Sequence, residues 1–437
     1  MRTTARRRAR RTSRSSLPAA WTLVPALLLA PGCASTGPNE GPASYYRPAG
    51  WLDPASSLDA PDFAAYRADA TRRVREHRRV VDTDDPAREI ELVSPAEFAP
   101  SGRGCDAAAP RAAVILVHGL SDTAFAMRDL AEALAARCFL TRTLLLPGHG
   151  TVPGDLLAVD HEDWLASVRR AVERARADGD RVAVVGFSLG AVLGLSLALE
   201  PDRPVDALVT ISPAFHLSSW RLARWAPWVH RLRPWVDREL PDDRFRYEAM
   251  PTRGVAETVR AVRELRRRVA EVPAGVDTPW MLIQSEDDAV VVPEANLAFF
   301  LERAVAPSSR ALLFRSASAE ASGTDDDPRV SVLPGSDAAT RVLGLTHVAV
   351  HVSPANAHYG VDGTYRNCGA TGGRAAASVA RCEAAEPGEL DFGLWGGEED
   401  VAIASARSTF NPRFDRLVDA IDEFLDPDGG RSPRTAD

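Results

Sequence analysis

The sequence predicts an α/β protein built on a mostly parallel, doubly wound sheet. Three observations lead to this fold class. Short apolar runs recur without polar alternation, as in AVILV at 113–117, and such runs are typical of strands covered on both faces. Helical segments separate these runs, and repeated strand–helix units imply parallel pairing. With 437 residues, the chain is long enough for one large domain of this kind with insertions.

The expected elements follow in chain order. A surface helix over 62–80 leads into a strand near 89–95, and strands and helices then alternate. The expected strands of the main sheet are 113–119, 140–148, 181–188, 205–213, 279–285, 311–316 and 329–336, and the expected helices between the first four are 124–137, 161–179 and 189–200. An amphipathic helix over 411–425 closes the fold.

A segment rich in tryptophan and arginine interrupts the alternation. Residues 214–276 hold four of the nine tryptophans, and a helix over 255–272 ends the segment. Its position between two core strands predicts a helical cap that separates a first core part, 61–213, from a second, 277–425. The alternative is an amphipathic helix used for packing or for a membrane surface.

The N-terminus has the features of an export signal. The first part of residues 1–32 contains seven arginines and no acid. An apolar stretch follows that is shorter than the ~20 residues of a spanning helix. LLLAPGC resembles a bacterial lipobox, so Cys33 is the expected lipidation site and 33–60 a lipidated tether and N-terminal arm; plain secretion is the alternative. Ala34 after the cysteine favours the outer membrane of a Gram-negative bacterium, facing the periplasm. The opposite end, 426–437, is expected to be disordered.

Charge and composition exclude several functions. The chain has no lysine, which excludes a Walker phosphate loop, a Schiff base and a lysine base. The formal net charge is −8, and removal of seven N-terminal arginines leaves 45 arginines against 60 acids, or about −15. This balance argues against nucleic acid as a partner.

The cysteines support an oxidising compartment. Cys105 and Cys138 each lie just upstream of an expected strand, so they should meet at one edge of the sheet. Cys368 and Cys382 lie together in a Gly-rich irregular insertion, 359–400. The expected disulfides are therefore Cys105–Cys138 and Cys368–Cys382. The alternative, four free or metal-binding thiols, lacks any CxxC spacing.

Ser188 is the candidate nucleophile. GFSLG fits G-x-S-x-G, follows a strand and precedes an apolar helix, which is the context that exposes a serine on a sharp turn. LVHGLSD ends another strand, and the backbone N–H groups of Leu120 and Leu189 are the expected donors to an oxyanion. His118 is expected to brace that loop. PGHG at 147–150 departs from the phosphate-loop pattern. HEDW at 161–164 lacks the second histidine of a zinc-protease helix.

An acid and a histidine complete the candidate site. The loop after the strand at 279–285 offers Glu286, Asp287 and Asp288, of which Asp288 is preferred and Asp287 comes next. His347 follows the last expected strand and is the preferred base. Along the chain the order is then nucleophile, acid and base, which is the order found where the nucleophile lies on a strand–turn–helix. His351 and His358 are the alternatives to His347.

These motifs together resemble a known group of enzymes. VILVHGLSD, LLLPGHGTVPGDL, VGFSLGA, SEDDAVVVP and THVAV are similar to α/β-hydrolase fold serine esterases of the carboxylesterase, monoacylglycerol lipase and lysophospholipase-like branch, over about 88–316 and 329–425. The resemblance implies hydrolysis of short- or medium-chain esters, monoacylglycerols or lysolipids through an acyl-enzyme on Ser188, without metal or cofactor. An aromatic acyl pocket is expected in the cap, formed by Phe215, Trp220, Trp225, Trp228 and Trp235. The alternatives are a non-catalytic envelope lipoprotein of the same fold that acts as a binding module, or an amide or thioester hydrolase.

Overall fold

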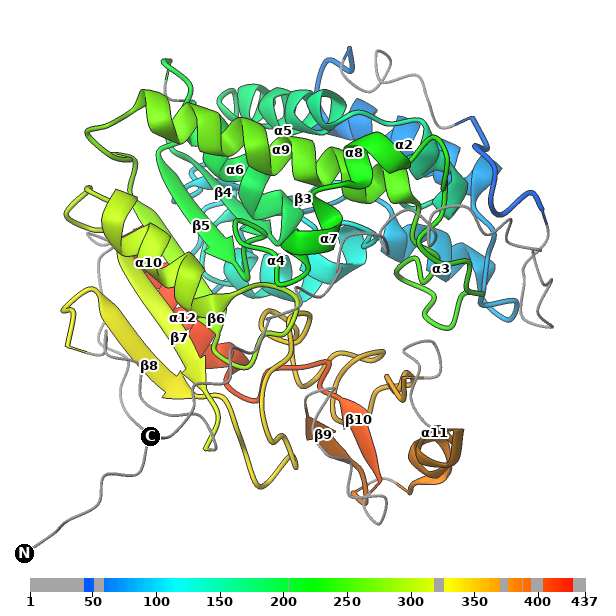
Figure 1. Cartoon of the computed structure of the whole chain (residues 1–437). Coiled ribbons are helices and arrows are strands. Elements are labelled where there is room, and N and C mark those ends of the chain that lie inside the picture. Colours follow the sequence, from blue (N-terminus) through cyan, green and yellow to red (C-terminus); the bar gives the residue numbers. More distant parts are fainter. Residues whose placement is uncertain are drawn as a thin grey trace, which may run out of the picture. The chain divides into compact units, whose positions relative to one another are not determined.

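The computed structural model describes residues 43–50, 59–202, 204–317, 326–369, 376–386, 388–393 and 404–426 (Figure 1). The expected signal peptide, Cys33 and the tail from 427 onward lie outside these residues. Within them, no helix is both long and apolar enough to cross a bilayer.

An eight-stranded sheet forms the centre of the fold, with strand order β1-β3-β2-β4-β5-β6-β7-β8. Only β1 runs antiparallel, against β3, and every other pair in this sheet is parallel. The central strands are buried along their full length, as expected for strands covered on both faces. The strands are β1 Ala96–Phe98, β2 Ala113–Val117, β3 Leu140–Thr143, β4 Val182–Phe187, β5 Ala207–Ile211, β6 Trp280–Ser285, β7 Arg310–Arg315 and β8 Val330–Pro334.

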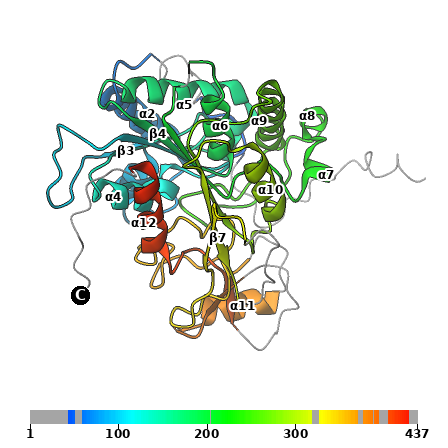
Figure 2. The ribbon, with the colours of Figure 1, turned by 90° about the vertical axis from the view of Figure 1, so that its left-hand side faces the viewer.

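Helices cover both faces of the sheet. Helices α2, α5, α6, α9 and α10 contribute to one hydrophobic cluster, and α4 and α12 contribute to a second on the opposite face (Figure 2). The architecture is thus the doubly wound α/β fold that the sequence predicts. The helices are α2 Phe63–His77, α3 Pro86–Val93, α4 Arg128–Ala135, α5 His161–Ala175, α6 Leu189–Ala198, α7 Trp220–Ala223, α8 Ala226–Val229, α9 Thr252–Glu271, α10 Pro293–Arg303, α11 Ala376–Ala384 and α12 Phe414–Leu425, with short 3-10 turns at Ala124–Met127 and Pro153–Leu157.

The strand expected near 89–95 is wrong, because this segment forms helix α3. Asp85 caps the helix by accepting a hydrogen bond from the backbone of Arg88, and Pro86 occupies the first turn. The buried Glu89 carboxylate accepts hydrogen bonds from the backbone of Val81 and Asp82, which fixes the helix against the preceding loop. The strand β1 begins only after α3 and is three residues long.

The segment between β5 and β6 carries α7, α8 and the long helix α9, where the sequence predicts a cap. Residues 43–50, within the expected tether and N-terminal arm, are in contact with this segment. Tyr45 and Tyr46 are buried with Trp235 of the cap segment, and Ala49 donates a backbone hydrogen bond of 2.6 Å to Asp155. These residues therefore pack onto the body of the protein.

The late insertion contains α11 and a two-stranded parallel sheet of β9, Asp391–Gly393, and β10, Ser405–Arg407. Cys368 is bonded to Cys382 within this insertion, and Cys105 is bonded to Cys138 beside the main sheet. Cys368 and Cys382 are both buried with Leu390 and Ala406. This second disulfide therefore lies at the centre of a small separate core.

Replacing both Cys105 and Cys138 by serine should lower the free energy of unfolding by about 4 kcal/mol. The bond closes a loop with a sequence separation of 33, and its loss returns that entropy to the unfolded chain. Denaturant unfolding of the two proteins measures the difference.

Cys368→Ser with Cys382→Ser, which opens a shorter loop of separation 14, should lower the free energy of unfolding by about 3 kcal/mol. Equal stability of wild type with and without reductant would contradict both values.

Candidate active site

Ser188 lies on a sharp turn between β4 and α6. Its backbone has a φ of 52° and a ψ of −108°, a conformation that costs a non-glycine residue about 1–3 kcal/mol. The glycines on either side permit the close approach that this turn requires. A Cβ on Gly186 would stand 2.4 Å from the carbonyl carbon of Gly190, and one on Gly190 would stand 2.2 Å from the Val117 oxygen. The turn therefore needs both glycines, and it presents the Ser188 side chain at the end of the strand.

His347 connects Ser188 to Asp288. Its Nε2 lies 3.0 Å from the Ser188 Oγ, and its Nδ1 lies 2.7 Å from Oδ2 of Asp288. The three residues come from the ends of three separate segments, after β4, after β6 and after β8. This is the hydrogen-bonded chain of nucleophile, base and orienting acid.

Asp288 is held as a charged acceptor. Its Oδ1 accepts from the backbone N–H groups of Val290 at 2.8 Å and Val291 at 3.1 Å, and its Oδ2 accepts from Gln284 Nε2 at 3.2 Å. Burial alone would raise the pKa of Asp288. The charge and hydrogen bond of His347 and the two backbone donors outweigh burial, so the pKa of Asp288 lies below its usual value.

The alternative acids and histidines point elsewhere. Asp287 accepts from Ser316 Oγ at 2.8 Å, and Glu286 forms an ion pair with Arg315. His358 contacts Asp243 through Nε2 at 3.1 Å. The structure therefore places Asp288, and neither Asp287 nor Glu286, beside His347.

A serine after the late insertion holds the base in place. The backbone N–H of Thr346 donates to Ser408 Oγ at 2.9 Å, and its side chain donates to the Ser408 carbonyl at 2.7 Å. Ser285 Oγ donates to the Leu345 carbonyl at 2.7 Å. The sequence analysis missed Ser408, Ser285 and Gln284, because single polar residues in a loop or strand carry no pattern that identifies them.

The expected oxyanion donors lie at the start of α6 and in the loop after β2. Leu189 is the first residue of α6, so its N–H has no partner within the helix. Close packing of Gly190 on the Val117 and His118 carbonyls brings this helix end against the loop that contains Leu120. In the part of the chain that is described, neither the Leu120 nor the Leu189 N–H donates to a protein acceptor. Both groups are therefore available to an oxyanion.

His118 and His149 brace the loop behind these donors. The Leu146 N–H donates to His118 Nε2 at 3.1 Å, so Nε2 is the unprotonated nitrogen and Nδ1 donates to the Gly119 carbonyl at 2.8 Å. Burial lowers the pKa of His118 to about 4. A neutral imidazole with both nitrogens in use is a structural group, as the sequence analysis expects.

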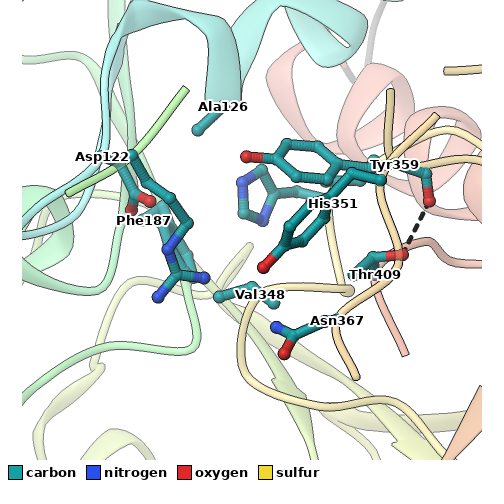
Figure 3. Close-up of a pocket in the computed structure, with 11 residues that line it drawn as sticks. Asp122, Ala126, Phe187, Val348, His351, Tyr359, Asn367 and Thr409 are labelled. Atoms are coloured by element: carbon teal, nitrogen blue, oxygen red, sulfur yellow. Dashed lines mark hydrogen bonds between the residues drawn. The ribbon is translucent and has the colours of Figure 1, made fainter. Parts of the chain in front are cut away.

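A small pocket with polar and apolar lining lies beside the triad, formed by the oxyanion loop, the His347 loop and the late insertion (Figure 3). Its volume of about 20 Å³ leaves room for about one water molecule, and the ring of Phe187, on one wall, lies 5.0 Å from the His347 ring. The residues that line it are Asp122, Ala126, Phe187, Arg246, Val348, His351, Val352, Tyr359, Tyr365, Asn367 and Thr409.

His351 and Arg246 are the unusual members of this lining. His351 is 1% exposed, and neither ring nitrogen has a hydrogen-bond partner within the described residues. Burial and the nearby His347 lower its pKa to about 3, so the ring is neutral. Burial alone would lower the pKa of Arg246, but the carboxylates around it, led by Glu248, raise it, so the guanidinium stays charged. Polar groups left unpaired around a cavity are groups that a ligand or water can satisfy.

The aromatic pocket expected in the cap does not form this cavity. Phe215 is wrong as a pocket residue, because its ring packs in the core against Trp280 and Phe299. Trp235 is buried against Tyr46, while Trp225 and Trp228 are exposed. The remaining cap tryptophan, Trp220, packs partly buried on the core under Arg266. None of the five lines the cavity beside the triad.

Replacing Asp122 by asparagine should stabilise the protein at pH 8 by up to about 3 kcal/mol. Burial raises the Asp122 pKa from 3.8 to about 6, against the opposing charges of Arg246 and His347. A raised folded-state pKa favours the native state below pH 4, and this contribution, about 3 kcal/mol for a rise of this size, is lost as pH rises through 6. Unfolding curves of both proteins at pH 4 and pH 8 test this. The gain should vanish at pH 4, and Asp180→Asn, at an exposed position, should show no such pH dependence. A gain of equal size at both pH values would contradict the assignment.

One carboxylate cluster has the residues of a metal site. Ligand atoms of His161, Glu162 and Glu257 lie within 4.8 Å of one another. Glu257, however, is surrounded by Arg253 and Arg260, which already supply positive charge. These residues form an ion-pair network on α5 and α9, and nothing in it requires a cation.

Several known proteins are similar to this chain. A family model described as "Serine aminopeptidase, S33" matches residues 108–316, which include Ser188 and Asp288. A thermostable monoacylglycerol lipase of Bacillus sp. (strain H-257) is 29% identical over 195 residues, covering 43% of this chain and 74% of the relative. A carboxylesterase of Bacillus subtilis (strain 168) is 24% identical over 197 residues, covering 43% and 76%. The crystal structure of a monoacylglycerol lipase of Paleococcus ferrophilus is 19% identical, covers 51% of this chain and 88% of that one, and has a TM-score of 0.42.

The sheet order, the strand–turn–helix at Ser188 and the family match identify an α/β-hydrolase fold. The protein is a serine hydrolase of that fold.

Proposed function

We propose that the protein hydrolyses small carboxylic esters through a covalent acyl-enzyme on Ser188. His347 takes the proton of the Ser188 hydroxyl as its Oγ attacks the ester carbonyl. The Leu120 and Leu189 N–H groups hold the resulting oxyanion, and Asp288 orients His347 and balances its positive charge. His347 then gives the proton to the departing alcohol. A water molecule, activated in the same way, hydrolyses the acyl-enzyme and regenerates Ser188.

The observation that carries this proposal is the geometry of Ser188, His347 and Asp288, with contacts of 3.0 and 2.7 Å. The protein is a carboxylic ester hydrolase, as its similarity to a monoacylglycerol lipase and a carboxylesterase indicates. Their names support monoacylglycerols and short- or medium-chain esters as substrates. The small pocket beside the triad, with Tyr359 and Tyr365 in its lining, favours a compact group next to the scissile bond.

A chain-length series of p-nitrophenyl esters, from acetate to palmitate, tests the activity and its range. We expect turnover that peaks at short or medium chains, and burst release of p-nitrophenol when deacylation is slow. Labelling by a fluorophosphonate probe should accompany turnover. Absence of both turnover and labelling would favour the alternative, a non-catalytic envelope protein that uses this fold for binding.

Amide hydrolysis is the second candidate, because the matching family model is described as a serine aminopeptidase. Including p-nitroanilides of amino acids in the series separates the two. A higher kcat/KM for anilides than for esters would replace the ester proposal.

We also propose that the protein is an exported lipoprotein, anchored through Cys33 on the outer membrane. What supports this is the sequence of the N-terminus alone. Metabolic labelling with an alkyne-bearing palmitate analogue should mark the wild type and leave Cys33→Ser unlabelled. Equal labelling of both would exclude this anchor.

A further inference from the structure

A concentrated group of exposed apolar side chains lies on α7, α8 and the loop after them. We call this the cap patch: Leu222, Trp225, Trp228, Leu232 and Val236, with the exposed arginines Arg221, Arg224, Arg231 and Arg233. α7 and α8 lie on the side of α9 that faces away from the sheet (Figure 2).

The exposure of this patch is large for so short a segment. Leu222 is 80%, Leu232 89% and Trp228 62% exposed. Ten large hydrophobic residues are exposed among the described residues, and five of them fall between 222 and 236. Single exposed apolar residues need no explanation, but a concentration of this kind marks an interaction surface.

The same segment has a charge opposite to that of the whole chain. Residues 207–236 contain no aspartate or glutamate, although the average of 60 acids in 437 residues would place about four there. The segment carries four arginines, while the chain has a formal net charge of −8. An anionic surface is therefore attracted to this face and repelled by much of the rest.

The aromatic and basic side chains of the patch are arranged together. The rings of Trp225 and Trp228 lie 5.5 Å apart, and the guanidinium of Arg224 stands 5.1 Å from the Trp225 ring. Tryptophan prefers the boundary between lipid headgroups and acyl chains, and arginine beside it binds anionic headgroups. A second copy of the chain is a poorer occupant, because a two-fold contact would bring the same four arginines face to face. We propose that the cap patch docks the protein onto the surface of a bilayer that contains anionic lipids.

Docking at this face would bring the catalytic edge of the sheet to the lipid. Leu217 pairs with Val291, and Ser218 donates its backbone N–H to the Val290 carbonyl at 3.0 Å. Val290 and Val291 are the two residues whose backbone holds Asp288. The cap patch begins four residues after Ser218. It therefore lies close in sequence to the segment that contacts the Asp288 loop. The consequence for lipid substrates rests on the proposed ester hydrolysis, but the docking itself does not.

Co-sedimentation with vesicles tests the docking in the full chain carrying Cys33→Ser, which removes the expected lipid anchor. Vesicles of phosphatidylcholine alone are compared with vesicles that contain phosphatidylglycerol as well. We expect binding to the anionic vesicles that weakens as salt rises. Trp225→Ser with Trp228→Ser should weaken it at least tenfold, and so should replacement of the four patch arginines by glutamine. All variants share the same N-terminal residues, so a difference between them arises in the patch.

Matched controls change the same chemistry elsewhere. Val305→Ser with Leu343→Ser removes two exposed apolar side chains outside the cap, and glutamine at Arg67, Arg75, Arg103 and Arg416 removes four exposed charges. Both should bind vesicles like the Cys33→Ser protein, and far-UV circular dichroism confirms that each variant is folded. Ser188→Ala should also bind, whatever its activity, which separates this proposal from the proposed reaction. Equal binding of the patch variants and the controls would overturn the proposal. A concentration-dependent dimer that the tryptophan substitutions abolish, without vesicle binding, would assign the patch to a second copy instead.

Discussion

Replacing Ser188 by alanine should lower kcat for ester hydrolysis by roughly 10⁴- to 10⁶-fold and abolish fluorophosphonate labelling. The substitution removes the Ser188 Oγ, which lies 3.0 Å from His347 Nε2. The backbone N–H donors stay in place, so a small residual rate is expected. Alanine has the same steric conflict as serine at a φ of 52°, and stability should therefore change little. Steady-state kinetics on p-nitrophenyl butyrate gives the rate, and thermal unfolding confirms the fold.

Ser212→Ala is a suitable control for this experiment. Ser212 also has a positive φ and a buried hydroxyl, at the end of the neighbouring strand β5, but this hydroxyl has no hydrogen-bond partner in the described residues. Its rate should stay within about tenfold of wild type. If both variants lost activity equally, the loss would be structural and Ser188 would not be the nucleophile.

Replacing Asp288 by asparagine should lower kcat by about 10⁴-fold while leaving KM within a few fold. The amide cannot stabilise the imidazolium that forms when His347 takes the proton, and it favours the wrong tautomer of the ring. Asp288 has the required geometry, with Oδ2 at 2.7 Å from Nδ1 of His347 and Oδ1 fixed by two backbone donors. The measurement is kcat against pH, since a hydroxide-assisted route should recover part of the rate at high pH.

Asp287→Asn is the matched control, one residue away in the same loop. Asp287 accepts from Ser316 and contacts no atom of His347 among the described residues, so its rate should fall less than tenfold. A larger loss at Asp287 than at Asp288 would reverse the assignment of the acid.

Much of this site could be predicted because its signals are local. The turn around Ser188 requires glycine at 186 and 190 for steric reasons, so five adjacent residues are enough to indicate the nucleophile. Ser188 and His347 are 159 residues apart, yet the alternation of strands and helices predicts that their loops share one edge of the sheet. The spacing alone left open whether Asp287 or Asp288 is the acid beside His347. Only the directions of the two side chains distinguish them.

The pocket beside the triad could not be predicted in this way. The tryptophans of the cap predicted an apolar pocket, but hydrophobic character does not say whether a ring is buried, as Phe215 is, or exposed, as Trp228 is. The actual lining includes Tyr359, Asn367 and Thr409 from around an irregular insertion, where no periodicity orients side chains. Helix α3 was missed for a related reason, since eight residues contain little more than two turns of apolar pattern.

The small core of the late insertion is connected by hydrogen bonds to the loop of the catalytic base. Asn367, next to the disulfide-bonded Cys368, accepts a backbone hydrogen bond from Arg407 at 2.9 Å, and the following residue, Ser408, fixes Thr346 beside His347. The nucleophile and the acid follow strands β4 and β6 of the main sheet. Opening the Cys368–Cys382 bond should therefore loosen the loop of the catalytic base, while the strands that end at the nucleophile and at the acid keep their places in the main sheet.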